Sequence, residues 1–592
     1  MKKIFIAIII VAALASCKQP ENNSNSEDNK ELATLLDNYF EEVLQLYPIN
    51  ATTIGDTRYN DLLPIDFTDS YRLKLKEVYT RYLADITKFN REQLNQHDQI
   101  SYDIFKREME MNTEGLGFHD NYIPSNQFAA LPLALGQMGS GEGIQPFKTV
   151  KDYDNWIKRA TAFSVWTDSA IVYFKKGMEA GFVLPKSLVI KMVPQMQGMV
   201  TDSAQGSLFY GPVKKMPENF SDADKQRITD GYVKLINEQL IPSFKKLGNF
   251  LQKEYLPKTR TTSGIGTLPD GAKYYAYLVR QQTTTNKTPE EIYQTGLQEV
   301  ARIRANMDSI KNVTGFKGNL PAFFEFMKTD KQFMPYKTPK EVLDAFEAIH
   351  QRMMPNLKKM FTVTPKTGFE IRQTEAFRAA SASAEYNQGT PDGSRPGIFY
   401  VPILDATTFN FTSGMESLFL HEAIPGHHYQ ISLQQEDTSL PKFRRFGGNN
   451  AYIEGWALYC ESQGKELGLY TDPYQHMGAL GDEIHRAIRL VVDVAIHTKG
   501  MSREEAIKYM MDNEAISEQG ATAEIERYMV IPAQALGYKI GALKIGEMRS
   551  RFEKQLGSKF NIAGFHTEVL KDGAMPLEVL EKKMDTWAKT QQ

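Results

Sequence analysis

The stretch His421-Glu422-Ala423-Ile424-Pro425-Gly426-His427-His428 places three imidazoles and a carboxylate within eight residues of a chain that has ten histidines in 592 residues. It is similar to the zinc-hydrolase helix H-E-x-x-H, in which two histidines one turn apart bind the metal and the glutamate acts as general base. In this chain Pro425 stands where the second histidine would fall. The stretch therefore predicts a variant zinc site on a helix.

Two histidines compete for the place of the second ligand. On a straight helix six residues turn about 600° and seven about 700°, so His428 would return closest to the side of His421. Pro425 and Gly426 disfavour a straight helix, because proline lacks an N–H and clashes with the preceding turn, while glycine accepts unusual dihedrals. A bulge there would bring His427 to the metal-facing side, so the spacing leaves both histidines open.

A polar helix surface is the alternative interpretation of this stretch. The run before it, Met415 to Leu420, is apolar except for Glu416 and Ser417, which favours a buried position. Buried imidazoles and carboxylates need partners, and a metal ion satisfies several of them together. We therefore favour the metal site.

A third protein ligand is expected on a second helix. Glu454 lies 27 residues after His427, among the apolar and aromatic residues of Y-I-E-G-W-A-L-Y. A carboxylate there would cost several kcal/mol unless it were paired or bound to a metal. Glu461 follows two helical turns later on the same face, where it would either orient a metal-bound histidine or be a solvated helix-end carboxylate.

A row of polar residues marks the next predicted helix, which runs from Ile484 to His497. His485, Arg489, Asp493 and His497 are each four residues apart, so they form one stripe on an otherwise mostly apolar helix. The stripe either faces solvent, with ordinary pairs of charges, or lines the active-site cavity. In the second case His497 would be available to a substrate carbonyl or its developing oxyanion.

Five segments together resemble a widespread bacterial family known as domain of unknown function 885, many of whose members are exported lipoproteins. The segments are D-G-S-R-P-G-I-F-Y at 392, H-E-A-I-P-G-H-H at 421, E-G-W-A-L-Y at 454, V-V-D-V-A-I-H at 491 and E-R-Y-M-V-I-P-A-Q-A-L-G-Y-K at 526. They span roughly the last 200 residues. The family is distantly similar to helical zinc peptidases such as angiotensin-converting enzyme and the Taq-type carboxypeptidases.

The resemblance implies a role for each matching residue. The family pattern H-E-x-x-P-G-H implies that His421 and His427 bind zinc, that Glu422 is the catalytic base and that Glu454 is the third ligand. Arg527-Tyr528-Met529-Val530 resembles the segment of angiotensin-converting enzyme whose tyrosine hydrogen-bonds the tetrahedral intermediate. Tyr528 is therefore the implied oxyanion donor.

The implied reaction is hydrolysis of a peptide bond by a zinc-activated water, with Glu422 moving the proton and Tyr528 or His497 stabilising the oxyanion. The strand-like segment from Gly397 to Pro402 would either pair with the substrate backbone or form a small structural sheet. The expected substrate contacts are basic or aromatic side chains, some of them able to hold a carboxylate: Arg395, Arg489, Arg527, Tyr538 and Lys539.

The amino terminus predicts export. Lys2 and Lys3 precede an apolar run from Ile4 to Leu14, and Leu14-Ala15-Ser16-Cys17 resembles the bacterial lipobox, whose cysteine is lipidated after cleavage. The run is too short to span a membrane, so residues 1–16 are interpreted as a signal peptide. Residues 17–31 are rich in polar residues and suit a flexible tether. We therefore expect a protein of the cell envelope, anchored to a membrane by lipid on Cys17.

Helical periodicity dominates the rest of the chain and predicts a mainly α-helical fold. The resemblance to helical zinc peptidases implies two lobes and a zincin-like architecture, with a small β-sheet beside the active-site helix. Thr, Ser, Gly and Pro cluster in residues 259–271. We interpret this cluster as a crossover within one continuous core, between an N-terminal helical lobe (32–258) and a catalytic lobe (272–592). The predicted helices include Leu32–Leu46, Asp69–Asn90, Val150–Ala180, Ser221–Tyr255, Pro289–Asn312 and Pro339–Phe361.

The composition argues against nucleic acid as a partner, but it is compatible with a second function besides peptide hydrolysis. The net charge of −3 and a pI near 6.4 give no electrostatic case for binding nucleic acid. A lipoprotein that binds peptides or glycans without catalysis, or a degenerate peptidase, would share the length and the aromatic content. The set His421, Glu422, His427 and Glu454 favours a zinc metallopeptidase acting on peptides, since a glycan binder has no need of it. The sequence does not give the oligomeric state.

Overall fold

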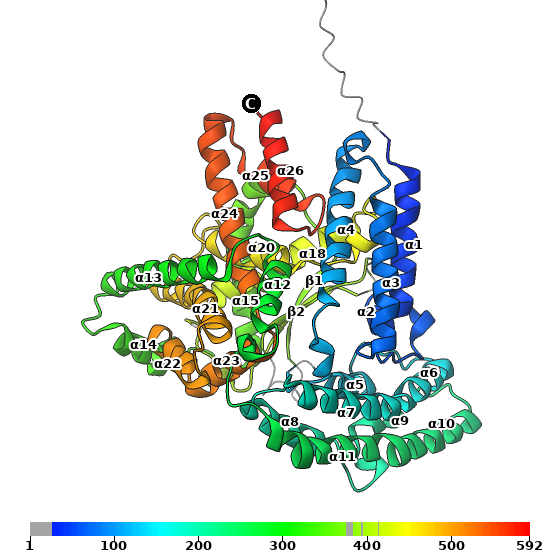
Figure 1. Ribbon diagram of the computed structural model, residues 1–592. Helices are drawn as coiled ribbons and strands as arrows, with labels where there is room; N and C mark the ends of the chain where they lie inside the picture. The colour runs from blue at the N-terminus through cyan, green and yellow to red at the C-terminus, as the bar shows by residue number, and fades with distance from the viewer. Residues whose placement is uncertain (1–26, 129, 375–382, 392, 394, 413) are drawn as a thin grey trace, which may run out of the picture.

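A computed structural model describes residues 27–128, 130–374, 383–391, 393, 395–412 and 414–592. The fold is mainly α-helical and two-lobed, with a small three-stranded sheet, as predicted. The first helices are α1 (Lys30–Leu46), α2 (Pro48–Thr53), α3 (Asp69–Ile86), α4 (Gln96–Gly115), α5 (Leu131–Gly139), α6 (Val150–Thr161), α7 (Phe163–Ala180), α8 (Lys186–Gly198), α9 (Gly211–Lys214), α10 (Asp222–Leu235) and α11 (Ile241–Phe250). In Figure 1, α1, α3 and α4 stand side by side, and α5 to α11 form a layer at the bottom of the view.

The helices that follow surround the sheet and carry the sequence motifs. They are α12 (Gly271–Thr283), α13 (Pro289–Val313), α14 (Leu320–Thr329), α15 (Pro339–Met360), α17 (Met415–Glu422), α18 (His427–Glu436), α19 (Lys442–Arg445), α20 (Asn450–Ser462), α21 (Pro473–Thr498), α22 (Arg503–Asn513), α23 (Glu518–Val530), α24 (Leu536–Leu556), α25 (Ile562–Leu570) and α26 (Leu577–Thr590). Helices α18 and α20 lie near the centre of the lobe, with α24 to α26 above them in the view (Figure 1).

Local sequence signals explain where many helices begin. At the start of α13, the Thr288 hydroxyl accepts the Glu291 N–H and the Glu291 carboxylate accepts the Thr288 N–H, a complete capping box followed by proline. The helix predicted over residues 221–255 is instead α10 and α11 joined by a π-helical segment, Ile236–Leu240. Pro242 explains this difference, because it cannot donate the regular hydrogen bond to the preceding turn.

The crossover at residues 259–271 is fixed to both lobes. The Arg260 N–H donates to the Leu184 carbonyl at 3.1 Å, and the Arg503 N–H donates to the Ser263 hydroxyl at 2.9 Å. Gly264 passes so close to α21 that a Cβ would lie 1.9 Å from the Ile496 carbonyl oxygen. Side chains from both sides of this segment also share one hydrophobic core. We therefore propose that residues 259–271 form the boundary between the two lobes and connect them rigidly.

The small sheet lies beside the histidine-bearing helices. Its strands are β1 (Phe369–Gln373), β2 (Glu385–Asn387) and β3 (Gly397–Val401), in the order β1-β3-β2. Strand β3 is parallel to β1 and antiparallel to β2. The predicted strand therefore forms, but both of its edges are occupied. Of the two alternatives for this strand, the structure supports the small structural sheet, because a peptide could join this sheet only at β1 or β2.

The predicted signal peptide and the lipidation site Cys17 lie outside the described residues. Helix α1 begins at Lys30, with the Asn29 side chain accepting two backbone N–H groups of its first turn. The Asn29 N–H also donates to the Asp98 carboxylate at 2.6 Å. The last residues of the predicted tether are thus part of the fold. Among the helices that the structure describes, none combines the length and the apolar composition of a membrane span.

Candidate metal centre

A break between α17 and α18 shapes the site. Helix α17 ends at Glu422 and α18 begins at His427, and the Ile424–Pro425 peptide between them is cis. Gly426 packs against the end of α17, where a Cβ would lie 1.9 Å from the His421 carbonyl oxygen, so only glycine fits. The rings of His421 and His427 lie 4.7 Å apart at nearly right angles.

Glu454 on α20 joins these two histidines. Its Oε2 atom lies 3.6 Å from His421 Nε2 and 3.5 Å from His427 Nε2. Ligand atoms bound to zinc at about 2.1 Å in tetrahedral geometry lie roughly 3.4 Å from one another. The two nitrogens and one oxygen therefore match the spacing and the donor types of a zinc site, with the fourth position left for water.

His428 faces the other way. Its Nδ1 lies 3.0 Å from the Tyr386 hydroxyl, and its ring lies 4.9 Å from that of Phe369, both residues of the sheet. Burial lowers the pKa of His428 to about 4. Of the two adjacent histidines, the structure thus brings His427 to His421 and Glu454.

A second carboxylate lies behind His421. Glu461 Oε1 accepts a hydrogen bond from His421 Nδ1 at 2.7 Å, and both side chains are buried. Burial alone would lower the pKa of His421, but Glu454 and Glu461 raise it well above its usual range. Burial would raise the pKa of Glu454, which His421 and His427 instead hold well below its ordinary value. The cluster thus favours a positive charge beside His421, carried by a proton or by a metal ion.

Glu422 is the last residue of α17 and is half-buried. It follows His421 directly, and its charge acts on the imidazole. A carboxylate in this position, partly open to solvent, can accept a proton from a water beside the metal ligands.

Close packing fixes α20, the helix of Glu454. Gly455 faces Gly541 of α24, and a Cβ on Gly541 would lie 1.9 Å from the Ala451 carbonyl oxygen. The Trp456 indole donates to the Pro425 carbonyl at 2.9 Å, which ties α20 to the break between α17 and α18. The glycine and the tryptophan of E-G-W therefore determine the position of the glutamate.

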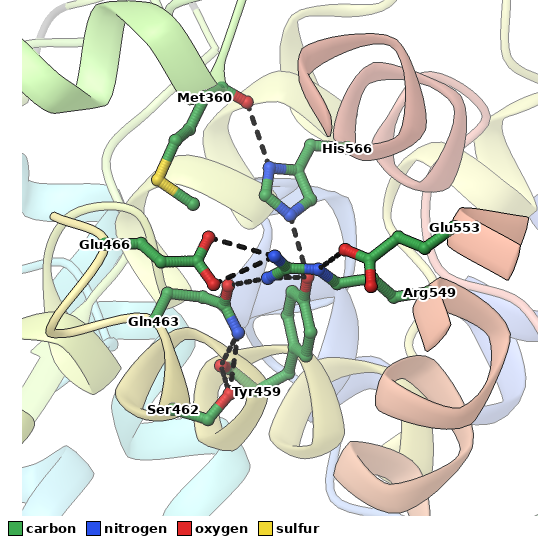
Figure 2. A network of polar contacts seen from close by, with 8 residues as sticks. All are labelled: Met360, Tyr459, Ser462, Gln463, Glu466, Arg549, Glu553 and His566. Carbon is green, nitrogen blue, oxygen red and sulfur yellow. Dashed lines mark hydrogen bonds and ion pairs between the residues drawn. The ribbon is translucent and has the colours of Figure 1, made fainter. Parts of the chain in front are cut away.

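Figure 2 shows how the end of α20 is held. The Tyr459 hydroxyl donates to His566 Nε2 at 2.9 Å, and His566 Nδ1 donates to the Met360 carbonyl at 2.9 Å. Arg549 of α24 bonds to Gln463 and forms ion pairs with Glu466 and Glu553. This network joins α15, α20, α24 and α25.

Three residues of the polar stripe on α21, Arg489, Asp493 and His497, are buried, and their polar groups bond to other parts of the protein. His497 Nδ1 accepts the Ile265 N–H, and Nε2 donates to the Tyr528 carbonyl, both at 3.0 Å. Burial lowers the pKa of His497 to about 3. Asp493 accepts hydrogen bonds from the Tyr275 hydroxyl and the Ala533 N–H. The catalytic role expected for His497 is therefore wrong, since neither ring nitrogen is free for a substrate.

Tyr528 takes part in an ion network. Its hydroxyl accepts from Arg489 Nε at 2.9 Å and donates to Glu524, which also bonds to Arg489. The side chain is almost fully buried. A tyrosine hydroxyl has one proton, and the Tyr528 hydroxyl donates it in a hydrogen bond to the Glu524 carboxylate and not to a substrate.

The expected substrate contacts lie in different environments. Lys539 is buried and bound to Glu299 and Glu483 at 2.9 and 2.8 Å, so the expectation that it holds a substrate carboxylate is wrong. Arg527 bonds to Gln534 at 2.7 Å, and the ring of Tyr538 lies 4.8 Å from the Arg489 guanidinium. Arg395 is exposed and bonds to the Gln388 carbonyl.

Two residues that shape the site were not predicted from the sequence. Tyr386, which binds His428, lies outside every motif and carries no signal of its own. Gly541, which sets the distance between α20 and α24, could have been suspected from the small-residue spacing G-Y-K-I-G in residues 537–541.

Comparison with known proteins gives a family and a fold. A family model described as bacterial protein of unknown function (DUF885) matches residues 48–584. Two solved structures have the same fold. A protein described as a lipoprotein from Colwellia psychrerythraea is 26% identical, with a TM-score of 0.86 over 95% of this chain and 99% of its own. A protein described as a lipoprotein of unknown function from Shewanella oneidensis is 20% identical, with a TM-score of 0.72 over 93% of this chain and 99% of its own.

More remote structures align only weakly. A Pyrococcus furiosus carboxypeptidase aligns at 9% identity and a TM-score of 0.40, over 95% of this chain and 99% of its own. No curated protein matches. The family model covers most of the chain, and the motifs around residues 392–539 lie within it. The chain belongs to the bacterial DUF885 family.

Proposed function

We propose that this protein is a zinc-dependent metallopeptidase of the bacterial cell envelope. One observation carries the proposal: His421 Nε2, His427 Nε2 and Glu454 Oε2 converge within 4.8 Å at spacings that suit zinc. Two features support it. Glu461 orients His421 from behind, as carboxylates do in many zinc sites, and Glu422 lies next to the ligands.

Different residues of the site would have different roles in the reaction. His421, His427 and Glu454 would hold the ion, and Glu461 would fix the tautomer of His421. Bound zinc supplies a polarised substrate carbonyl and a more acidic water. Glu422 would accept the proton of that water and return it to the leaving amine of the peptide. Arg395, Arg527 and Tyr538 remain the proposed substrate contacts, whereas Tyr528 is left without a role while its hydroxyl donates to Glu524.

The proposed location rests on the amino terminus. We propose cleavage before Cys17 and lipid attachment to that cysteine, with the folded part outside the cytoplasm. The solved structures of the same fold are described as lipoproteins, which supports export and anchoring. The membrane anchor would then be the lipid.

Glu422→Gln tests the catalytic part of the proposal. The variant should keep its zinc, because the amide replaces no ligand, while kcat/KM on a peptide mixture falls by about 10²- to 10⁴-fold. Elemental analysis and mass spectrometry of the digested peptides measure the two effects separately. Glu238→Gln, at an exposed position on the N-terminal lobe, is the matched control and should behave as the unmutated chain.

Two results would overturn parts of the proposal. Full activity in Glu422→Gln would remove the residue from the mechanism. Absence of peptide cleavage by the zinc-loaded unmutated chain, on a broad peptide mixture, would favour the alternative of a binding lipoprotein without catalysis.

A further inference from the structure

Tyr470, in the turn between α20 and α21, has an unusual backbone conformation. Its φ angle is +57°, in the left-handed region that side chains other than glycine seldom adopt. A bulky residue stays in this region only where the surrounding structure fixes it, and such residues are frequent at functional sites. The contacts that fix Tyr470 come mainly from α17 and α20, the helices that carry His421 and Glu454.

The backbone of Tyr470 binds the first turn of α17. Its N–H donates to Glu416 Oε2 at 2.7 Å, in a buried position. Arg352 of α15 donates to the other oxygen, Glu416 Oε1, at 2.6 Å. Glu416 is buried, so its charge needs both partners. Tyr470 is thus bonded to α17 five residues before His421.

The side chain of Tyr470 binds the last turns of α20. Its hydroxyl donates to the Glu461 carbonyl at 2.9 Å, and this bond is also buried. Glu461 is the residue whose carboxylate accepts a hydrogen bond from His421 Nδ1. The hydroxyl therefore fixes the backbone of the residue that orients a proposed metal ligand.

Close packing confines the tyrosine ring. A Cβ on Gly464, just after α20, would lie 2.1 Å from Tyr470 Cε2, so only glycine leaves room for the ring. The ring of His476, on α21, lies nearly parallel to it, with centroids 5.7 Å apart. The hydroxyl is therefore held in place from both the backbone and the ring.

We propose that Tyr470 is a positioning residue of the metal centre, which clamps α17 to α20 and thereby fixes the pair of His421 and Glu461. One residue bonds to both helices, so a shift of one helix along the other would break one of the two hydrogen bonds. Tight metal binding needs ligands held within about half an ångström. The inference rests on the proposed zinc site, and it gives Tyr470 no contact with a substrate.

Tyr470→Phe tests the clamp, because it removes the hydroxyl and keeps the ring. The zinc dissociation constant of the purified chain, measured by competition with a chelator, should rise by about tenfold, as it does when partners of metal-binding histidines are lost. The visible absorption of bound cobalt(II), which reports the geometry of its ligands, should change as well.

Tyr153→Phe is the matched control. The Tyr153 hydroxyl donates to the Pro212 carbonyl at 3.0 Å in a buried position of the N-terminal lobe. The control variant loses the same kind of hydrogen bond, so its unfolding free energy in urea should fall by a similar amount. Its zinc dissociation constant and its cobalt spectrum should equal those of the unmutated chain.

Two results would overturn the inference and leave the metal centre in place. One is equal zinc affinity of Tyr470→Phe and the unmutated chain. The other is an equal loss of zinc affinity in Tyr153→Phe, which would trace the effect to general stability. Absence of zinc binding by the unmutated chain would instead overturn the proposed metal centre, and the inference with it.

Discussion

His427 and His428 are adjacent in the chain but lie in opposite environments. His427 faces His421 and Glu454, whereas His428 is bound to the sheet by Tyr386. Other buried histidines in this protein hold backbone groups together. His497 and His566 each bond through both ring nitrogens, and burial lowers each pKa to about 3. Their neutral form is therefore part of the native structure.

The buried neutral imidazole of His566 should make the native state less stable in acid. The folded pKa of His566 lies below the unfolded value of about 6.5, so the unfolded chain binds more protons between these values and stability falls as the pH falls through this window. Between pH 7 and pH 5 the loss from this residue is about 2 kcal/mol. In urea titrations at the two pH values, His566→Gln should show a loss smaller by that amount. An identical loss in both proteins would contradict the burial of a neutral imidazole.

Single residues also show how far the sequence could predict the site. His421, Glu422 and Glu454 were singled out because carboxylates and imidazoles in apolar surroundings need partners. Periodicity left His427 and His428 open, and only the family pattern implied His427; the break at Gly426 gives the geometric reason, because it brings His427 to His421 and Glu454. The exclusion of His497 and Lys539 required their partners, which come from segments far away in sequence.

At the scale of elements, the site depends on how closely α20 approaches α24. Gly541→Ala would place a methyl group against the Ala451 carbonyl and push the helices apart, so we expect a loss of about 1–3 kcal/mol in unfolding free energy. Gly546→Ala, on the same helix with open space around its Cα, should gain about 0.5–1 kcal/mol. Denaturant unfolding of both variants measures the contrast. Equal effects of the two substitutions would argue against the close helix contact.

Elements differed in how well the sequence predicted them. Helices such as α13 and α15 have apolar periodicity and a Thr-Pro start, so their bounds were predicted closely. Strand β3 was predicted from its β-favouring residues, but its central place in the sheet depends on β1 and β2, which have no comparable signal. Pairing is a property of several strands, and one strand cannot reveal it.

At the scale of the whole molecule, one core crosses between the lobes. Buried residues of the N-terminal lobe and of α21 and α23 belong to the same hydrophobic cluster, and the crossover at residues 259–271 is bonded on both sides. We expect thermal unfolding in a single cooperative transition, with no trypsin cleavage at Lys258 or Arg260 in the native state. Calorimetry and limited proteolysis test this. Two separate transitions, or a stable fragment ending near residue 260, would show that the lobes fold independently.

Zinc content of the purified chain tests the central claim most directly. Elemental analysis should find about one zinc ion per chain in the unmutated protein and in His428→Ala, and none in His427→Ala. The two variants remove the same side chain from neighbouring positions, so a general loss of folding would affect both. No zinc in the unmutated chain after zinc is supplied, or loss of zinc with His428→Ala instead of His427→Ala, would contradict the proposed metal centre.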